Sequence, residues 1–487
     1  MKKAWEIESE LFSGAKPVVR QADEQTWEDN FDVSGFYDQN LSLDWGSNVP
    51  GSGAPEKIMV AAVQALENSG YKVSEEGYRD LERGLDAFDR KDFVELHKCS
   101  ALLRRELANA EKDPASEYWK YHYYKDFQDY ESAVEFPARV PVDPDTERFR
   151  DQVRAGWLAQ LIGGAMGTMV EGYSSAAIRD AFGEVYDFLR EPNTYNDDTT
   201  YELAFLEAFS EKGYDVTSED IALNWVGTIP CGWSAEEIAL RNLKNGIFPP
   251  ESGLTRNPFK EWIGAQMRGG ICGMTAPGDP KTAASLAWRD GCISHANNGV
   301  LGEVFNACLT SLSFVEQDVK KILRDAIALV PEDSEYRSVL DYAYDACGRN
   351  SDYRGALSEC EQKYRRYNWI HAYPNACCEV IALYFGGGDF RETLHIITMC
   401  GLDADCNAGM TMPVVAIRGG TDAIPEQYRH PAFEKLTTYM RGEDSEVTLD
   451  ALVDKTVDSV LKAARALLRP EETGQQRVAF PEHFYFI

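Results

Sequence analysis

Two short acidic segments, separated by about two hundred positions, carry the residue types best suited to chemistry. Residues 196–198 (Asn-Asp-Asp) precede a helix-like run, and residues 403–406 (Asp-Ala-Asp-Cys) follow an apolar stretch. Carboxylates that converge on one point repel each other, so they either acquire raised pKa values or recruit a divalent cation through their oxygen atoms. Each acidic segment is therefore a candidate for this chemistry.

The spacing of the acids limits the local structure in which they can lie. On a regular helix, residues two apart face away from each other, whereas an extended or turning backbone points both to one side. Asp403 and Asp405 are therefore expected in a loop or in the first turn of a helix. Asp197 and Asp198 also have a purely structural explanation, because acids at a helix start cap free amides and suit the positive end of the helix dipole.

A third segment, residues 161–172 (Leu-Ile-Gly-Gly-Ala-Met-Gly-Thr-Met-Val-Glu-Gly), is rich in glycine and has Glu171 as its only charged residue. Small residues allow backbones to approach closely, so helix packing is a sufficient explanation for the glycines. The chain contains no P-loop and no G-x-G-x-x-G motif. This disfavours binding of nucleoside triphosphates and of dinucleotides.

The elements that must position these segments are predicted to be helices. Apolar residues recur every four positions from residue 149 to 161, after a possible cap at Asp143, and a helical pattern from residue 453 to 468 stops at Pro470. No stretch of residues 146–470 alternates long enough to indicate a sheet. We therefore predict an all-α protein with a large helical domain, residues 146–487, and a smaller, partly helical N-terminal extension, residues 1–145.

The extension itself is less clearly patterned. Residues 1–55 show no sustained periodicity, whereas residues 56–130 favour short amphipathic helices. The aromatic run at residues 119–127 is either a docking surface or a contact with the following domain. The extension could shield the pocket, mediate self-association or recruit a target, and these alternatives stay open.

Composition excludes several classes of partner. The chain has 80 acidic and 49 basic residues, a formal net charge of −31, which disfavours nucleic acid and anionic membranes. The longest apolar stretch, residues 158–170, is too short to span a bilayer, and the start does not resemble a signal peptide, so a cytoplasmic location is expected. The eleven cysteines form no C-x-x-C and the histidines no H-E-x-x-H, which favours reduced, buried thiols and a metal held by oxygen.

In their order along the chain, residues 161–172, 196–198 and 403–406 resemble the ADP-ribosylglycohydrolase family, whose motifs are G-D-A-x-G…E, T-D-D-T and G-x-D-x-D-T-N-A. The resemblance covers about residues 146–430. Residues 371–376 (His-Ala-Tyr-Pro-Asn-Ala) and 386–390 (Gly-Gly-Gly-Asp-Phe) also look like the family's lead-in to its last acidic motif. Residues 257–299 are similar to a microbial and fungal branch of the family.

The resemblance implies an all-α, orthogonally packed domain with a central acidic cleft that binds two Mg²⁺ ions, with Mn²⁺ as an alternative. The implied reaction is hydrolysis of the glycosidic bond at the anomeric carbon of an ADP-ribosyl group, where carboxylates stabilise the positive charge that develops. The implied catalytic residues are Glu171, at the mouth of the cleft, with Asp198 and Asp403. The implied metal ligands are Asn196, Asp197, Asp198, Asp403, Asp405 and Cys406.

Three positions depart from the family motifs. Gly164 stands where the family has aspartate, whereas Asn196 and Cys406 stand where it has threonine. An amide oxygen still binds Mg²⁺, so the change at Asn196 is mild. A thiol is a soft and reluctant ligand for Mg²⁺, so Cys406 is expected to weaken one metal, to shift the preference toward Mn²⁺ or to leave that position to water.

Substrate contacts are expected from the glycine-rich segment and from side chains that lie between the two acidic segments. Trp225 could stack on a base, and Arg268 has the fork geometry that suits a phosphate. For each candidate, packing in the core or capping of a helix is an alternative explanation. The complete set of expected substrate-binding residues is Gly167, Trp225, Arg268, His295, Asn297 and Asn298.

We therefore predict a Mg²⁺-dependent hydrolase of a ribosyl N-glycosidic bond. Its substrate is expected to be an ADP-ribosylated protein, a free ADP-ribose derivative or another riboside such as a nucleoside. Two alternatives stay open: a catalytically silent ADP-ribose-binding or structural member of the same family, and a two-metal phosphoesterase. The sequence makes no prediction about the oligomeric state.

Overall fold

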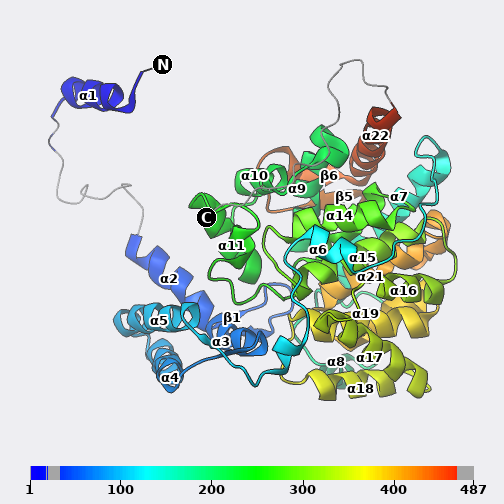
Figure 1. Ribbon diagram of the computed structural model, residues 1–487, viewed down its shortest axis with the longest axis horizontal. Helices are drawn as coiled ribbons and strands as arrows, with labels where there is room; N and C mark the ends of the chain where they lie inside the picture. The colour runs from blue at the N-terminus through cyan, green and yellow to red at the C-terminus, as the bar shows by residue number, and fades with distance from the viewer. Residues whose placement is uncertain (1, 18, 20–32, 469–487) are drawn as a thin grey trace.

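The computed structural model describes residues 2–17, 19 and 33–468, and helices form nearly all of the regular structure in these residues (Figure 1). The predicted all-α fold class is confirmed. The helices before residue 145 are α1 (Ala4–Gly14), α2 (Val33–Trp45), α3 (Ile58–Asn68), α4 (Glu75–Asp89), α5 (Phe93–Ala108) and α6 (Phe127–Ser132). The predicted short helices after residue 56 are therefore present.

The larger, C-terminal part of the chain contains the remaining α-helices. They are α7 (Glu147–Gly167), α8 (Ser175–Phe182), α9 (Asp197–Lys212), α10 (Ser218–Thr228), α11 (Ser234–Lys244), α12 (Glu251–Leu254), α13 (Gly269–Thr275), α14 (Pro280–Gly291), α15 (Asn298–Ser313), α16 (Val319–Ala328), α17 (Glu335–Arg349), α18 (Tyr353–Tyr364), α19 (Ala372–Gly386), α20 (Phe390–Cys400), α21 (Ala404–Ala416) and α22 (Leu449–Leu468). The predicted last helix thus reaches Leu468, and Pro470 lies outside the described residues.

Short elements connect these helices. The 3₁₀-helices are η2 (Glu117–Lys120), η3 (Gly213–Asp215), η4 (Gln266–Arg268), η5 (Gly420–Ala423), η6 (Glu426–Tyr428), η7 (Pro431–Glu434) and η8 (Gly442–Ser445). The strands form three antiparallel pairs: β1 (Ser47–Asn48) with β2 (Pro55–Glu56), β3 (Tyr71–Lys72) with β4 (Glu111–Lys112), and β5 (Lys435–Thr437) with β6 (Glu446–Thr448). Each strand has two or three residues, too few to show alternation in the sequence.

Helix α7 shows how the sequence produces the core. Its residues Phe149, Val153 and Trp157 recur every four positions and are fully buried. The helix begins after Thr146, whose Oγ1 accepts a hydrogen bond from the Phe149 amide at 3.2 Å. The predicted cap at Asp143 is therefore wrong, because Thr146 places its hydroxyl on an otherwise free amide three residues later.

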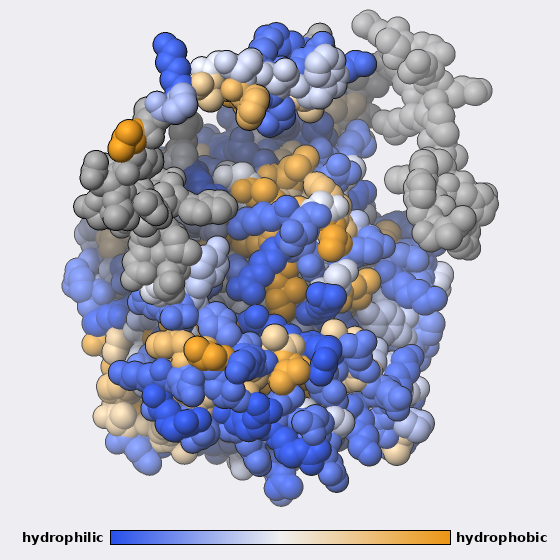
Figure 2. Space-filling model, turned by 90° about the vertical axis from the view of Figure 1, so that its left-hand side faces the viewer, coloured by the Kyte–Doolittle hydropathy of each residue, from blue (hydrophilic) through white to orange (hydrophobic). Residues whose placement is uncertain are grey.

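The N-terminal extension shares its core with the larger domain. In helix α3, Ile58, Ala61 and Ala65 belong to the main hydrophobic core, whereas Met59 and Val63 belong to a separate small core within the extension. Helices α2 to α5 consequently lie against one side of the main body (Figure 1). The surface on this side is mostly hydrophilic, with small, scattered apolar areas (Figure 2).

The aromatic run of the extension packs onto the large domain. The Tyr124 amide donates a hydrogen bond to Asn297 Oδ1 at 3.0 Å, and the Tyr118 hydroxyl donates to Glu261 at 2.6 Å. Both tyrosines are buried. Of the two explanations for this run, the structure therefore supports contact with the following domain.

All eleven cysteines lie in the described part of the chain and are free, and nine of them are buried, in line with the expectation of reduced thiols. None of the described helices has both the length and the apolar character needed to cross a bilayer.

Candidate active site

The two acidic segments meet at the N-termini of two helices. Asp198 lies in the first turn of α9, and Asp405 lies in the first turn of α21. The Cys406 thiol donates to Asp198 Oδ1 at 3.1 Å, and Asn196 Nδ2 donates to Asp405 Oδ2 at 3.3 Å. Side chains more than two hundred positions apart thus share one buried site, as the resemblance implies. Both helix dipoles direct their positive ends toward the acids, which partly offsets their repulsion.

Local hydrogen bonds fix the backbone at each segment. Asn196 caps α9, because its Oδ1 accepts from the Asp198 amide at 2.6 Å. Asp403 is the N-cap residue of α21, with non-helical backbone angles, and Asp405 follows in the first turn. The pair therefore adopts the loop-to-helix arrangement that its spacing indicates.

Asn375 is a positioning residue that the sequence analysis did not assign. Its Oδ1 accepts from the Asp403 amide at 3.2 Å and from Asn407 Nδ2 at 2.7 Å. Its Nδ2 donates to the carbonyls of Trp369 and His371 at 2.7 and 2.9 Å. This one amide therefore ties α19 to the start of α21. The resemblance of residues 371–376 to the family lead-in is the signal that could have identified it.

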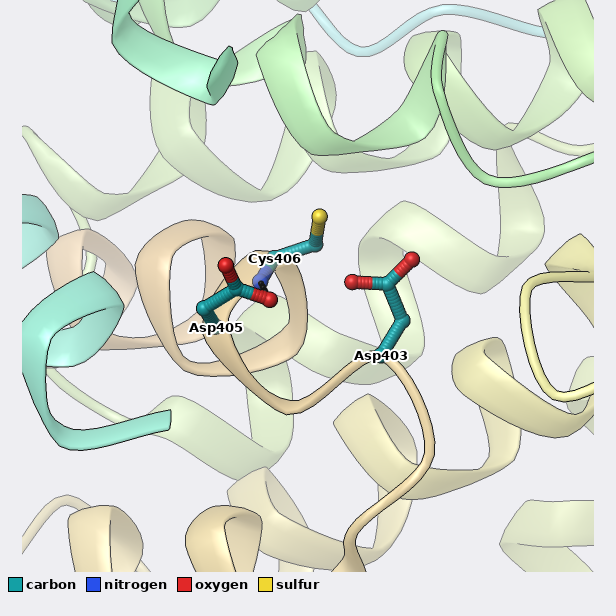
Figure 3. A group of neighbouring side chains, drawn as sticks. All are labelled: Asp403, Asp405 and Cys406. Atoms are coloured by element: carbon teal, nitrogen blue, oxygen red, sulfur yellow. Dashed lines mark hydrogen bonds between the residues drawn. The ribbon is translucent and has the colours of Figure 1, made fainter. Parts of the chain in front are cut away.

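Three side chains of the late segment form a potential metal-binding group (Figure 3). Asp403, Asp405 and Cys406 each offer one ligand atom, and these atoms all lie within 4.8 Å of one another. Asp403 Oδ1 is buried and accepts no hydrogen bond from the described residues. A buried carboxylate oxygen without a partner is costly, and a hard cation satisfies it. The side chains present therefore fit Mg²⁺ or a similar ion.

The acids of the site have raised pKa values. Burial is the largest cause for Asp198, Asp403 and Asp405, and repulsion by neighbouring aspartates raises each pKa further, to about 7 for Asp405. Burial also raises the pKa of Asp197. Within the described residues, no lysine or arginine forms an ion pair with these four acids. The repulsion among these acids is therefore not offset by a basic side chain of the described residues.

Glu171 joins this cluster from the turn after α7. Burial raises its pKa well above the usual range, followed by repulsion from the four aspartates. The turn is fixed to the late acidic segment, because the Gly172 amide donates to the Leu402 carbonyl at 2.7 Å and the Leu402 amide donates to the Tyr173 carbonyl at 2.9 Å. The structure thus brings Glu171 to the same acids.

The thiol of Cys406 stays protonated in this environment. Burial and the surrounding aspartates raise its pKa well above the usual range, and the thiol donates to Asp198. It also contacts Met267 Sδ at 3.7 Å. In this structure Cys406 thus orients Asp198, a role that a neutral thiol performs without binding a metal.

Replacing Cys406 by serine tests whether a hard oxygen at this position strengthens Mg²⁺ binding. A hydroxyl retains the donor and adds a hard oxygen, so we expect the Mg²⁺ dissociation constant of Cys406→Ser to fall about tenfold, with a smaller change for Mn²⁺. Isothermal titration calorimetry measures both. Cys292→Ser, in which a thiol beside Ser218 is replaced, is the matched control. An unchanged Mg²⁺ affinity in Cys406→Ser contradicts the expected gain from the hard oxygen.

The glycines of α7 serve helix packing and the placement of the site. A Cβ atom on Gly167 would lie 2.2 Å from the Ala404 carbonyl oxygen, so only glycine lets α21 approach α7 at this point. A Cβ atom on Gly164 would lie 3.2 Å from Asn196 Nδ2. The position that carries aspartate in the family therefore borders the metal-binding group here. A pocket lined by Gln160, Thr168 and Asn196, among others, adjoins it.

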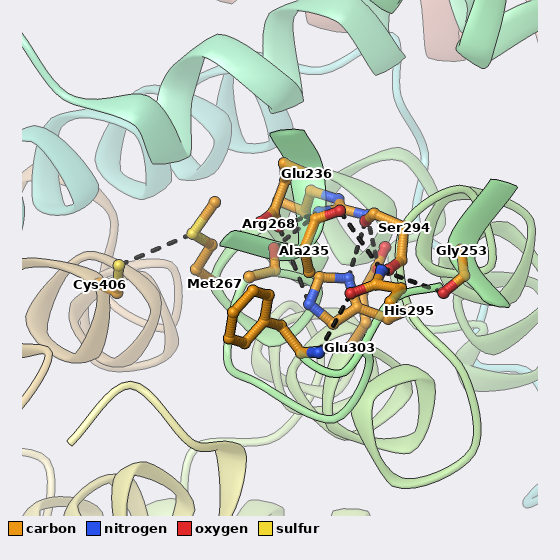
Figure 4. Close-up of polar contacts among 12 residues, drawn as sticks. Ala235, Glu236, Gly253, Met267, Arg268, Ser294, His295, Glu303 and Cys406 are labelled. Carbon is orange, nitrogen blue, oxygen red and sulfur yellow. Dashed lines mark hydrogen bonds and ion pairs between the residues drawn. The ribbon is translucent and has the colours of Figure 1, made fainter. Parts of the chain in front are cut away.

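Two expected substrate contacts, Trp225 and Arg268, lie inside the core, and Figure 4 shows the polar contacts of Arg268. Trp225 is 0% exposed, and the Arg268 guanidinium lies 4.8 Å from the centre of its ring. Arg268 is 1% exposed and donates to Asp290, to Glu236 at 3.2 Å and to the Gly264 carbonyl at 2.7 Å. Neither side chain has a free face or donor toward solvent. The expectation that Trp225 and Arg268 contact the substrate is therefore revised. Both side chains belong to a buried network behind the site.

The remaining expected contacts are also buried within the protein. His295 is buried, with Nδ1 at 2.7 Å from Ser294 Oγ, and burial lowers its pKa well below the usual range. Asn297 and Asn298 donate to the two oxygens of Glu261 at 3.0 and 3.2 Å. These asparagines therefore hold α15 and the aromatic run against Glu261, whereas Asn297 forms no side-chain cap of α15, the alternative expected for it.

Fold and site together define an all-α protein whose candidate site is suited to divalent cations. A family model described as ADP-ribosylglycohydrolase matches residues 145–466, so the chain belongs to this family. A protein of Archaeoglobus fulgidus, described only as uncharacterized, is 26% identical over 300 residues, which are 58% of this chain and 90% of that protein. A solved structure described as an ADP-ribosylglycohydrolase-related protein complex is 18% identical, with a TM-score of 0.46 over 66% of this chain and 99% of that one. Family membership supports a glycohydrolase-like function.

Proposed function

We propose that this protein is a Mg²⁺-dependent hydrolase of a ribosyl N-glycosidic bond, in an ADP-ribosyl group or a related riboside. The observation that carries the proposal is the convergence of Asp198 and Asp405 at two facing helix N-termini, without a lysine or arginine ion pair among the described residues. Acids arranged in this way suit divalent ions that hold a ribose.

The residues proposed to hold the ions provide hard oxygen atoms. They are Asn196, Asp197, Asp198, Asp403 and Asp405, with Cys406 as a supporting donor. When bound, two Mg²⁺ ions neutralise the acids, hold the ribose hydroxyls and orient water. Mn²⁺ is the expected substitute.

The chain's own acids have a second task in the proposed reaction. Cleavage at the anomeric carbon builds positive charge on the ribose ring, and the carboxylates of Asp198 and Asp403 stabilise that charge. Glu171 reaches the same acids from the turn after α7, where we assign it the positioning of the attacking water.

A catalytically silent member of the family is the second candidate, favoured by the thiol at Cys406 and by Gly164 in place of an aspartate. Incubation of the purified chain with a panel of ribosides and ADP-ribosylated peptides, with Mg²⁺ and with chelator, separates the two. We expect mass analysis to show a free ribosyl product that requires Mg²⁺. Release of phosphate or a nucleoside monophosphate instead indicates the phosphoesterase alternative, and no turnover with intact Mg²⁺ binding indicates the silent one.

The stabilisation by Mg²⁺ is expected to increase with pH. The pKa of Asp405 is about 7 without metal, above an unfolded value of about 4. Between these values the folded state binds more protons, so the stability of the metal-free protein falls as pH rises. Mg²⁺ binds to ionised carboxylates, so bound Mg²⁺ offsets the loss of stability that the metal-free protein shows at higher pH.

Thermal unfolding with Mg²⁺ and with chelator at pH 5.5 and pH 8 measures this effect. At pH 8 and a hundredfold excess of Mg²⁺ over its dissociation constant, we expect the melting temperature to rise by about 5 °C. The rise at pH 5.5 is expected to be much smaller. Equal shifts at the two pH values contradict the prediction.

A further inference from the structure

A segment of the N-terminal extension, residues 47–56, lies directly on the loops of the candidate site. It consists of β1, a turn and β2, which pair through Ser47 and Glu56. At its tip, Gly51 packs so closely on Thr168 that a Cβ atom there would lie 2.2 Å from Thr168 Cγ2. Arg190 Nη1 donates to the Gly51 carbonyl at 3.1 Å. Thr168 lines the pocket beside the metal-binding group, so the tip lies at that pocket.

The same segment covers the turn that carries Glu171. A Cβ atom on Gly172, the next residue, would lie 2.6 Å from Ala54 Cβ. The Tyr173 hydroxyl donates to the Ser52 carbonyl at 3.3 Å. The Gly172 amide donates a hydrogen bond to the carbonyl of Leu402, the residue before Asp403. The segment therefore rests on the two loops that carry the proposed catalytic acids Glu171 and Asp403.

The far end of the segment is fixed to another wall of the site. Glu56 Oε2 accepts a hydrogen bond from Trp233 Nε1 at 2.8 Å. Trp233 is the N-cap residue of α11, and a Cβ atom on its neighbour Gly232 would lie 3.0 Å from the Tyr201 hydroxyl of α9. The segment therefore connects the side of the site formed by α7 and α21 with the side formed by α9 and α11.

The segment is held in one conformation. The Val49 amide donates to the Ala54 carbonyl at 2.8 Å, and the Gly53 amide donates to the Val49 carbonyl at 2.8 Å. Ala54 and Glu56 are buried although they lie in a connecting segment, and α3 follows at once with residues in the main core. A connection with closed backbone hydrogen bonds and buried side chains moves less than an open loop.

The acids lie deep beneath this part of the molecule. Asp198, Asp403 and Asp405 are 1%, 4% and 6% exposed. Under the proposed function a small riboside reaches these acids, whereas a folded protein must bring its attached ADP-ribosyl group to the same depth against a fixed segment of backbone. Such a steric barrier discriminates against the larger substrate without any contact that favours the smaller one.

We propose that residues 47–56 form a fixed cover that restricts the site to small-molecule ribosides and excludes ADP-ribosyl groups attached to folded proteins. The cover is thus a specificity-determining part of the N-terminal extension. This inference rests on the proposed hydrolase function, and it selects one substrate class among those that the site chemistry accepts.

The test compares two substrates with the same ADP-ribosyl group, one with a small aromatic leaving group and one attached to a folded protein. A variant that lacks residues 51–53 removes the tip, and Glu56→Gln weakens the bond to Trp233. The matched control is Glu67→Gln. It makes the same change in a carboxylate that accepts a hydrogen bond from the Tyr78 hydroxyl elsewhere in the extension. Thermal unfolding verifies that each variant folds.

For the wild type we expect kcat/KM to be at least about a hundredfold higher for the small substrate. The shortened variant is expected to gain at least about tenfold on the protein-linked substrate, with the small substrate changed by less than about threefold. The cover proposal is overturned if the wild-type kcat/KM is comparable for the two substrates. It is also overturned if the shortened variant shows no gain on the protein-linked substrate. If neither the wild type nor a folded variant turns over either substrate, the hydrolase proposal is overturned instead.

Binding distinguishes the two failures. Calorimetry with free ADP-ribose and with the ADP-ribosylated protein measures access to the site without chemistry. We expect the wild type to bind only the free compound and the shortened variant to bind both. If the wild type binds both equally, or if the shortened variant binds neither, the cover is excluded whether or not hydrolysis occurs.

Discussion

Asp403→Asn is expected to lose at least about a thousandfold in kcat/KM and to lose Mg²⁺ binding at one or both positions. Asp403 is 4% exposed, and its Oδ1 accepts no hydrogen bond from the described residues. Asparagine has the same shape but no charge and one fewer oxygen for a cation. The change therefore removes a proposed ligand and leaves the surrounding backbone in place.

The same variant is expected to be more stable than the wild type when both lack metal. Burial and Asp405 raise the pKa of Asp403, which shows that its ionised form is unfavourable in the metal-free site. Removing that charge relieves repulsion within the cluster. A variant that is inactive and yet more stable without metal is the signature of a functional acid, because a structural acid gives the opposite change in stability.

Chemical denaturation with chelator, calorimetry with Mg²⁺ and riboside turnover measure the three quantities on the same preparation. Asp345→Asn, at an exposed position of α17, is the matched control and is expected to change none of them. If Asp403→Asn retains wild-type Mg²⁺ binding, the proposed metal site is wrong. If it loses stability without metal, Asp403 has a structural role instead.

Arg268→Met is expected to destabilise the fold by about 3–5 kcal/mol. The guanidinium is 1% exposed and contacts three buried acids: Asp290, Glu236 at 3.2 Å and Glu303 at 3.9 Å. Methionine fills similar space but leaves those acids without their cation. Burial already raises the pKa of Glu236 to about 7 and that of Glu303 further, so the uncompensated charges are costly.

Arg268→Lys separates charge from geometry. A lysine supplies the positive charge but not the planar fork that serves several acceptors at once, so we expect an intermediate loss of stability. Denaturant titration measures the free energy of unfolding for both variants. A phosphate-binding arginine, by contrast, leaves stability near the wild-type value and weakens substrate binding, and that outcome contradicts the structural role.

The helices and the chemistry of the site were accessible from the sequence alone. The four-residue recurrence of Phe149, Val153 and Trp157 predicts α7, because side-chain spacing on a helix is a local property. The Asp-x-Asp spacing predicts the loop-to-helix position of Asp403 and Asp405 for the same reason. The resemblance to a family then supplied the pairing of these acids with the segment near residue 197.

The roles of the isolated polar side chains were not accessible in this way. Arg268 has the same fork whether it binds a phosphate or three buried acids, and Asn297 has the same amide whether it contacts a sugar or Glu261. The difference lies in which helix faces pack against each other. That outcome depends on contacts between residues distant in the chain, which no local pattern encodes.

The same reason explains the cover over the site. The sequence of residues 47–56 is a short glycine- and proline-containing stretch without sustained periodicity, for which no element was predicted. It lies on the loops beside the site because α3 joins the main core on one face and thereby holds the preceding segment against Thr168 and Gly172. The sequence by itself thus determined the helices and the acidic chemistry of this protein. Tertiary packing decided which side chains face the site and which chain segment closes it, because burial is a property of the assembled fold.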